Sequence, residues 1–228
     1  MSVLGLGDVS ARADATEAIA AVFDLEGFTN FCKQIDPQLS VPKYLYSFLS
    51  WLMERLRDEM RQDLHENDVV LWSTLPFFVK FLGDGLLVLW DASTMDVVSQ
   101  RNVIVSCAAI CRSYRTVFLT TLKARLVDPP RALRCGIARG TVFSVGKGLD
   151  YVGSCINMAA RLQKLPGISF CFNCRGFELE GHNPIFFEKS IVVKQVAIRG
   201  IGERELVGIL KSEGDKLGPK DRKLFKEP

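Results

Sequence analysis

Two aspartates, Asp24 and Asp84, occupy positions where local structure presents a carboxylate. Asp24 ends the apolar run 18–24, which is typical of a buried strand that delivers a side chain at its end. Asp84 lies between two glycines and two β-prone apolar runs, a pattern that predicts a hairpin with the aspartate at its tip. If the two elements are neighbours in one sheet, both carboxylates reach the same Mg²⁺ or Mn²⁺ ions, which prefer oxygen ligands. Two such ions activate an attacking hydroxyl and neutralise a leaving pyrophosphate.

A second pair, Asn157 and Arg161, lies in a segment, 156–165, whose pattern predicts a short helix. Residues four apart share a helix face, so the amide and the guanidinium act on the same anionic group. A guanidinium fixed beside a phosphoryl group stabilises the charge of a transition state. Taken one at a time, these residues are also explained as a surface arginine, a capping asparagine and two turn or cap aspartates.

The elements that position these residues alternate between strands and helices. The period of the apolar residues predicts an amphipathic helix after Pro42 and a long helix over 97–122. Strands are expected at 18–24, 77–82, 86–90, 133–138, 141–145, 169–172 and 191–198. The Lys-rich tail from Lys211 is expected to be loose. Because helices accompany both hairpin and crossover strands, we predict an α+β fold, a sheet layered with helices.

The composition is that of an ordinary globular protein. The chain has 228 residues, 48% hydrophobic and 24% charged, and we expect a single domain over residues 1–228. Its 29 Lys and Arg nearly balance 26 Asp and Glu, so no nucleic-acid partner is expected. No apolar run has the length of a membrane span and the first residues lack a signal-peptide pattern, so we expect a cytoplasmic protein without a membrane partner.

The seven cysteines, an odd number among mostly apolar neighbours, are interpreted as small buried side chains in a reducing compartment. An alternative is a zinc site formed by Cys171, Cys174 and His182, although the neighbourhood offers no fourth ligand. On that alternative the chain is a non-enzymatic interaction domain.

Four separated segments together resemble the class III nucleotidyl cyclases, the adenylate and guanylate cyclase family. They read DLEGFT at 24–29, KFLGDG at 80–85, GIARGTV at 136–142 and DYVGSCINMAAR at 150–161, in the family's order and approximate spacing. The resemblance covers about residues 18–210. It implies a cyclase homology domain with a mixed or antiparallel central sheet, a ferredoxin-like core, flanking helices and a head-to-tail homodimer with each active site built across the interface.

The resemblance assigns roles to individual residues of the first two segments. Asp24 and Asp84 hold two divalent cations, Mn²⁺ or Mg²⁺, and the carbonyl of Leu25 is a further ligand. The triphosphate is bound by backbone amides, a task that needs a bend with exposed N–H groups. These amides belong to Gly27, Phe28 and Thr29.

The resemblance also implies which residues bind the ribose, the phosphates and the base of the nucleotide. From the other protomer, Asn157 orients the ribose and Arg161 stabilises charge on the α-phosphate. Arg199 stands where the family usually has a phosphate-binding lysine, and it keeps the charge. Lys80 and Asp150 recognise the base. The implied reaction is attack of the ribose 3′-hydroxyl on the α-phosphate, which gives a 3′,5′-cyclic nucleotide and pyrophosphate.

The base is the point on which two resemblances differ. Lys80, four residues before Asp84, and Asp150, seven before Asn157, follow the pattern of family members that take ATP and make cyclic AMP. In overall build, without an attached sensor, coiled-coil or membrane domain, the chain resembles the standalone pyrimidine cyclases of bacterial antiphage (Pycsar) systems, which make cyclic UMP or cyclic CMP. Bulky side chains are expected to narrow the base pocket for a pyrimidine, and they are equally explained as core residues. These are Tyr44, Tyr46, Trp72, Phe77 and Phe78.

We therefore expect UTP as the substrate and cyclic UMP as an antiphage second messenger, with ATP as the alternative. A third interpretation is an inactive cyclase-like domain that binds a nucleotide or a partner. The usual mark of such a domain is a lost metal aspartate or a lost arginine, and here Asp24, Asp84 and Arg161 are all present.

Overall fold

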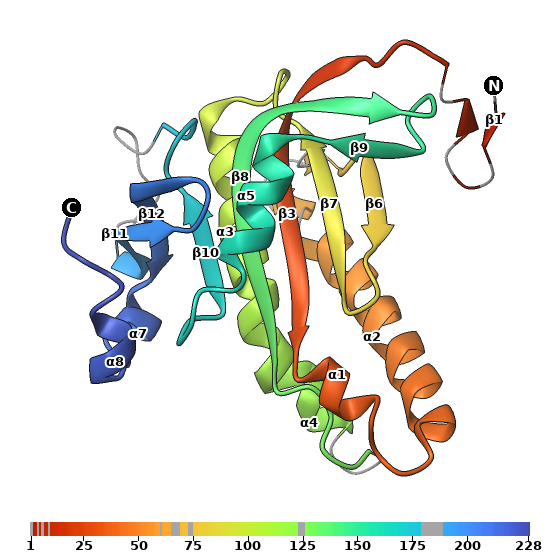
Figure 1. Cartoon of the computed structure of the whole chain (residues 1–228), viewed down its shortest axis with the longest axis vertical. Coiled ribbons are helices and arrows are strands. Elements are labelled where there is room, and N and C mark those ends of the chain that lie inside the picture. Colours follow the sequence, from red (N-terminus) through yellow and green to blue (C-terminus); the bar gives the residue numbers. More distant parts are fainter. Residues whose placement is uncertain are drawn as a thin grey trace.

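The protein is built around one mixed β-sheet of eight strands, in the order β11-β12-β10-β8-β3-β7-β6 with β9 paired to β8, as seen in a computed structural model (Figure 1). The structure describes residues 1–228 except 1, 4, 6, 9, 60, 65–68, 73–74, 123–125 and 179–188, and of 2, 3, 59, 61–64 and 69–72 it describes the backbone alone. The strands are β3 (Ala15–Glu26), β6 (Phe78–Phe81), β7 (Gly85–Asp91), β8 (Ala132–Val145), β9 (Asp150–Val152), β10 (Phe170–Asn173), β11 (Ile191–Ile198) and β12 (Gly202–Leu210).

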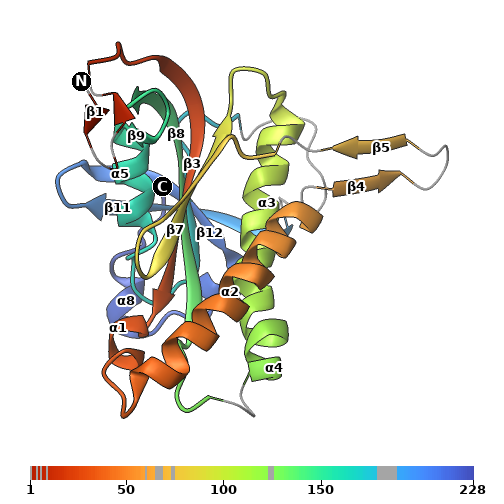
Figure 2. The same cartoon turned by 90° about the vertical axis from the view of Figure 1, so that its right-hand side faces the viewer.

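Helices cover both faces of this sheet (Figures 1 and 2). One face carries α2 (Pro37–Glu59) and a continuous helical run made of α3 (Val97–Ser113), the π-helical segment η1 (Tyr114–Phe118) and α4 (Leu119–Leu122). The other face carries α5 (Ser154–Leu162). Three short helices and two small hairpins complete the described elements. They are α1 (Phe28–Phe31), α7 (Lys211–Gly214), α8 (Pro219–Arg222), β1 (Ser2–Val3) with β2 (Gly7–Asp8), and β4 (Arg61–Leu64) with β5 (Val69–Trp72).

The order of the central elements is that of a ferredoxin-like core. Along the chain β3, α2, β6, β7, α3 and β8 follow one another, and in the sheet β8, β3, β7 and β6 are neighbours, all antiparallel. Beyond β8, strand β10 pairs in parallel and carries β12 and β11 to the far edge. The fold is therefore α+β with a mixed, mostly antiparallel sheet, as the sequence predicts.

Strand β3 is apolar from Ala18 to Phe23 because this part is buried on both faces. Side chains of a strand alternate between faces. Ile19 and Phe23 belong to the core cluster under α2 and α3, whereas Ala20 and Val22 belong to the cluster under α5. Because the side chain of Asp24 follows Ala20 and Val22 in this alternation, its carboxylate lies on the face that carries α5.

The helical run Val97–Leu122 is long and apolar enough to cross a membrane by length and composition. Most of its apolar side chains are nevertheless buried against the sheet, including Val103, Ile104 and Cys107, which are 0% exposed. Asp96 caps the helix, where its carboxylate accepts a hydrogen bond from the N–H of Ser99 over 2.7 Å. The run is therefore the core helix of a globular fold, the long helix that the sequence predicts.

Two expectations about element boundaries are wrong. Helix α2 begins at Pro37, not after Pro42, because proline fits the first helical position, and the helix continues through Pro42. Strand β8 runs without a break through Gly140, where two strands were expected. It pairs with β3 residue by residue, so the ladder from Ala132 to Phe143 has no register shift to end it.

The expectation of a loose tail after Lys211 is also wrong. The side chains of Leu217 and Phe225 are buried in the core cluster under α5. Lys226 extends the edge of the sheet, where it exchanges two backbone hydrogen bonds with Gln195 over 2.8 and 2.9 Å. Burial of these two apolar side chains stabilises the packed tail, although the lysines between them favour contact with water.

Candidate active site

The carboxylates of Asp24 and Asp84 line one cavity of about 330 Å³ at the end of β3 and the tip of the β6–β7 hairpin. Asp24 is opposite Gly85 in the ladder of β3 and β7, and the N–H of Leu25 donates to the carbonyl of Asp84 over 2.9 Å. Gly85 permits this approach, because a Cβ there would lie 1.8 Å from the carbonyl oxygen of Phe23. The two elements are thus neighbours in one sheet, which is the condition under which both carboxylates reach the same ions.

Arg134, a residue that the sequence analysis did not single out, is the partner of Asp24. It lies opposite Asp24 in the ladder of β3 and β8, and its Nη2 donates to Asp24 Oδ2 over 2.6 Å. Its Nε is buried and has no acceptor among the described residues. A cation held by Asp24 would replace this guanidinium as the counter-charge and would free Arg134 for an anion in the same cavity.

The donor set of this cavity suits hard divalent cations that share a substrate's phosphates. It supplies two carboxylates, while nowhere in the described part of the chain do three His, Cys, Asp or Glu side chains gather at one point. Mg²⁺ is typically held by one or two carboxylates together with water and substrate phosphate oxygens. The residues therefore fit ions of this type and do not fit a closed four-ligand structural site.

The turn after β3 brings backbone amides to the same cavity. Gly27 has φ 90°, a left-handed conformation that glycine adopts without strain, and α1 starts at the next residue. Gly27, Phe28 and Thr29 all line the cavity. The first N–H groups of a helix have no acceptor within the helix, so this turn presents donors for an anion beside the carboxylates.

Asn157 and Arg161 line a second cavity, of about 350 Å³, that shares no lining residue with the first. Both side chains are exposed on one face of α5, and Met158, which lines the same cavity, is buried against the sheet. Cys155 also lines this cavity. Burial raises the pKa of its thiol to about 11, so the thiol stays protonated at neutral pH and is a poor nucleophile there.

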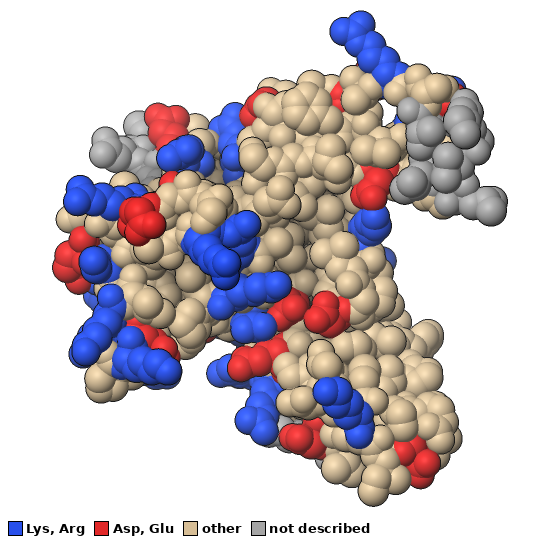
Figure 3. All heavy atoms as spheres, in the orientation of Figure 1, with Lys and Arg blue, Asp and Glu red and all other residues tan. Residues whose placement is uncertain are grey.

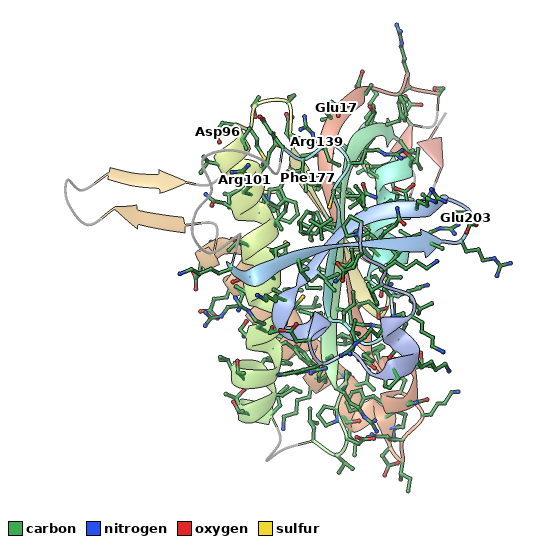
Figure 4. The ribbon with its side chains drawn as sticks, turned by 90° about the vertical axis from the view of Figure 1, so that its left-hand side faces the viewer. Glu17, Asp96, Arg101, Arg139, Phe177 and Glu203 are labelled. Carbon is green, nitrogen blue, oxygen red and sulfur yellow. The ribbon has the colours of Figure 1, made fainter. Side chains whose placement is uncertain are left out.

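Three polar residues that the sequence analysis missed complete the second cavity: Arg139, Asn173 and Arg175. Arg139 lies near the start of α3 (Figure 4), and its Nη1 donates to Gln100 Oε1 over 3.0 Å and to the carbonyl of Gly176 over 2.8 Å. The available signal was a charged residue inside an apolar strand, as Arg139 is within β8. Arg134 carries the same signal in the same strand.

Lys80 and Asp150 form an ion pair that joins β6 to β9. Side-chain alternation puts Lys80 on the sheet face that carries α5, the face against which Phe78 packs. Phe77 and Phe78 surround the ring of Tyr151, with centroids 5.3 and 4.9 Å from it. The predicted base-recognition pair thus exists within one chain, beside three aromatic rings, and belongs to neither of the two cavities.

Arg199 is exposed in the turn between β11 and β12 and is not a lining residue of the second cavity. Its neighbours Gly200 and Ile201 do line that cavity. A Cβ built at Gly200 would lie 3.2 Å from Nη1 of Arg161, so the turn lies against the guanidinium. The structure therefore brings the Arg199 turn to Arg161, with the Arg199 side chain at the rim.

The interpretation of two bulky residues as pocket side chains is wrong. Tyr44 is fully buried on α2, and its hydroxyl shares a 2.8 Å hydrogen bond with that of Tyr114. Burial raises the pKa of the Tyr44 hydroxyl. Tyr46 is 76% exposed on the same helix. Helix α2 packs on the sheet face opposite α5, so neither ring reaches the residues described above. The side chain of Trp72 lies outside the described residues.

The cysteines do not form the zinc cluster that the sequence left open. Cys171 is buried in the core cluster under α5, whereas Cys174 packs against the cluster on the other face of the sheet. The third candidate ligand, His182, lies outside the described residues. All seven cysteines are free thiols. Burial raises the pKa of Cys174 to about 12, which fits a structural role.

The candidate residues thus form two separate halves on one face of the sheet. Asp24, Asp84 and Arg134 make an acidic and phosphate-compatible half, and Asn157 and Arg161 make a cationic half on α5. Figure 3 shows this face, with basic side chains gathered around its centre and acidic side chains beside them. A ligand that touches both sets has to span two cavities of one chain or lie between two chains.

No family model matches the sequence, and no curated protein matches it. Solved structures do match. The guanylyl cyclase Cya2 is 16% identical over 88% of this chain and 94% of that chain, with a TM-score of 0.61. A bacterial light-regulated adenylyl cyclase is 14% identical, with a TM-score of 0.57, over 92% of this chain, which spans 56% of that longer chain.

A third match extends the likeness to an isolated catalytic core. The catalytic core of a rhodopsin-guanylyl cyclase with converted specificity, solved in complex with ATPαS, is 13% identical over 88% of this chain and 98% of that chain, with a TM-score of 0.51. Identities this low establish a fold and leave the activity to the site. The chain has the fold of the class III adenylyl and guanylyl cyclase catalytic domains.

Proposed function

We propose that the protein is a nucleotide cyclase that converts a nucleoside triphosphate to a 3′,5′-cyclic nucleotide and pyrophosphate. The observation that carries this proposal is the convergence of Asp24 and Asp84, sixty residues apart, in one cavity with the amides of 27–29, within a cyclase-type fold. The same sheet face presents Asn157 and Arg161 on α5. These are the two kinds of group, anionic and cationic, that transfer of a phosphoryl group to a hydroxyl requires.

Asp24, Asp84 and the carbonyl of Leu25 are the proposed ligands of two divalent cations, Mn²⁺ or Mg²⁺. When bound, these cations supply charge neutralisation at the phosphates and lower the pKa of the attacking hydroxyl. Arg134 then exchanges its carboxylate partner for a phosphate oxygen, with Nη2, which now pairs with Asp24, as the donor. The amides of Gly27, Phe28 and Thr29 donate to the triphosphate from the opposite side of the same cavity.

The second half of the site is proposed to come from another copy of the chain. The two cavities of one chain share no lining residue, and a head-to-tail homodimer brings the cationic cavity of one copy to the acidic cavity of the other. Asn157 then orients the ribose by hydrogen bonding, and Arg161 stabilises the charge on the α-phosphate. Arg199, on the turn against Arg161, binds the outer phosphates. A homodimer carries two complete sites.

The proposed reaction needs no side chain as a general base. The ribose 3′-oxygen forms a bond to the α-phosphorus, and the bond from that phosphorus to the bridging oxygen of the β-phosphate breaks. The hydroxyl proton passes to water, and pyrophosphate leaves with the bridging oxygen. The attraction between the Arg161 guanidinium and the α-phosphate becomes stronger as negative charge grows there, so Arg161 stabilises the transition state more than the bound substrate.

We propose UTP as the substrate, which makes the product cyclic UMP. Support comes from Phe77, Phe78 and Tyr151, which crowd the region beside Lys80 and leave less room for a purine. The Lys80 ammonium donates to a base carbonyl, which uracil presents. The antiphage signalling role in the cytoplasm belongs to this same proposal, and the seven free thiols support a reducing compartment.

ATP is the second candidate, and one observation favours it. Lys80 and Asp150 are paired with each other, so together they present a donor and an acceptor at one place. An adenine edge carries both an acceptor nitrogen and an amino donor, which matches such a pair.

The base is tested by offering the purified protein ATP, GTP, CTP and UTP separately with Mn²⁺ and identifying the products by mass spectrometry. We expect cyclic UMP as the main product. Cyclic AMP as the only product would overturn the pyrimidine assignment and leave the cyclase assignment intact. If none of the four yields a cyclic product while nucleotide binding persists, the chain is an inactive cyclase-like domain.

A further inference from the structure

A cavity of about 720 Å³ lies next to the proposed reaction site, and apart from Arg134 its lining residues have no part in the proposed reaction. It opens between the end of β3, the α3–η1 run, the loop 164–169 after α5, and α7. Its volume is within the range of small-molecule sites, which is roughly 300 to 1,000 Å³. It adjoins the Asp24 cavity, because Arg134 and Lys164 line both.

The lining of this cavity is basic. Five cationic side chains line it, against two carboxylates, Glu26 and Glu213. Both oxygens of Glu213 are engaged by Ser169, one by its backbone N–H over 3.0 Å and the other by its hydroxyl. The five cations are Arg112, Arg115, Arg134, Lys164 and Lys216.

Three of these cations have no carboxylate within ion-pair distance among the described residues: Arg115, Lys164 and Lys216. They come from three separate segments, η1, the loop after α5 and the turn after α7, so the fold gathers them from distant points of the chain. All three side chains are exposed, so water and salt screen much of their mutual repulsion, and an anion held between them is attracted by all three charges at once. The gathering therefore points to an anionic ligand.

The chemistry of the cations selects the kind of anion. Guanidinium groups bind phosphate through paired N–H donors, and lysines add point charges that a multiply charged group satisfies better than a single carboxylate does.

We propose that this cavity is a binding site for a polyphosphate anion, pyrophosphate or longer, that is separate from the metal-binding carboxylates. Arg115 and Lys216 hold its outer end and Arg134 and Lys164 its inner end. Two sources of such an anion share this chemistry: the pyrophosphate or polyphosphate tail of a bound nucleotide, and a free polyphosphate from solution.

The test measures the affinity of inorganic pyrophosphate for the full chain by calorimetry, without metal and without nucleotide, so its outcome does not depend on cyclase activity. The test variant is Arg115→Ala/Lys216→Ala, whose two residues line the large cavity and not the Asp24 cavity. The control is Lys43→Ala/Lys223→Ala, which removes the same charge from exposed positions outside the large cavity.

We expect the test variant to weaken pyrophosphate binding by about tenfold or more for each charge-assisted hydrogen bond lost, and the control to change it by less than about twofold. Equal affinity in the wild type and the test variant, or equal weakening in both variants, overturns the proposal. So does the absence of pyrophosphate binding to the wild type.

The source of the anion is separated by repeating the titration with a saturating, non-reactive nucleoside triphosphate analogue and Mn²⁺. Loss of pyrophosphate binding means that the cavity takes the tail of the nucleotide or the released product. Simultaneous binding of both means that the cavity takes a separate polyphosphate from solution. In either case the binding must remain sensitive to the Arg115→Ala/Lys216→Ala change.

Discussion

At the scale of single residues, the pairing of Asp24 with Arg134 decides how the acidic half of the site behaves. The ion pair is largely buried, with 14% and 23% of the two side chains exposed, so neither charge is left uncompensated. A bound cation and a triphosphate offer the same two groups new partners, a metal for the carboxylate and a phosphate for the guanidinium. In the absence of ligands, each of the two side chains therefore neutralises the charge of the other, and the proposed cation and triphosphate would replace this pairing.

We predict that Asp84→Asn lowers the cyclisation rate by about a thousandfold or more, because metal ions contribute several kcal/mol to such reactions. Asparagine keeps the size of the side chain, and Asp84 makes no side-chain ion pair in the described structure, so the fold should persist. The measurement is product formation with Mn²⁺, together with Mn²⁺ binding by calorimetry.

The matched control is Asp58→Asn, an exposed carboxylate on α2 that pairs with its neighbour Arg57. Its activity should equal that of the wild type. If Asp84→Asn binds Mn²⁺ and turns over like the control, the two-metal assignment is wrong.

At the scale of elements, the hairpin of β6 and β7 owes its position to one glycine. Gly85 lies opposite Asp24, and any Cβ there collides with the backbone carbonyl of Phe23. The sequence pattern around Asp84 predicts the hairpin, and its distance from β3 follows from this close approach. The position of the Asp84 carboxylate therefore depends on the close approach of the β7 and β3 backbones.

We predict that Gly85→Ala destabilises the protein by about 1–3 kcal/mol, the usual cost of overpacking, because β7 must move away from β3. Metal affinity should fall as well, since the same movement separates Asp84 from Asp24. Urea unfolding and Mn²⁺ titration measure the two effects.

Gly218→Ala provides the comparison, because a Cβ at Gly218 meets nothing within 4 Å and its φ of −65° suits alanine. Its unfolding midpoint should stay within experimental error of the wild type. A Gly85→Ala midpoint equally close to the wild type contradicts the structural role given to this position.

At the scale of the whole molecule, the two halves of the site lie in separate cavities of one chain. A complete site across a homodimer predicts complementation between two inactive variants. Mixing Asp84→Asn with Arg161→Ala restores one intact site in each mixed dimer, because each chain supplies the half that the other lacks. Random mixing in equal amounts makes half of the dimers mixed, so we expect about a quarter of wild-type activity.

The two variants are co-refolded or co-expressed, and the cyclase activity is compared with that of each variant alone. A control mixture of Asp84→Asn with Asp24→Ala should stay inactive, because both changes damage the same half. Absence of rescue in the first mixture would show that the site is assembled within one chain.

The sequence by itself determined the local features, because they depend on neighbours a few residues apart. The alternation and apolar run before Asp24 indicate a buried strand, and the Gly-Asp-Gly pattern around Asp84 indicates a hairpin; both are present. The long core helix over 97–122 and the α+β class also follow from apolar periodicity. Helix boundaries and the tail were less predictable, because anchors such as Phe225 act through distant contacts.

Only the tertiary structure decided which of these features meet. Strand register places Arg134 against Asp24, and no local pattern contains a pairing between residues 110 positions apart. In the sequence, Tyr44 and Lys80 are both candidates for the base pocket. The packing of α2 buries Tyr44 in the core, whereas the pairing of β6 and the position of β9 place Lys80 beside Asp150. The gathering of Arg115, Lys164 and Lys216 around one cavity has the same origin: packing brings together side chains that periodicity cannot relate.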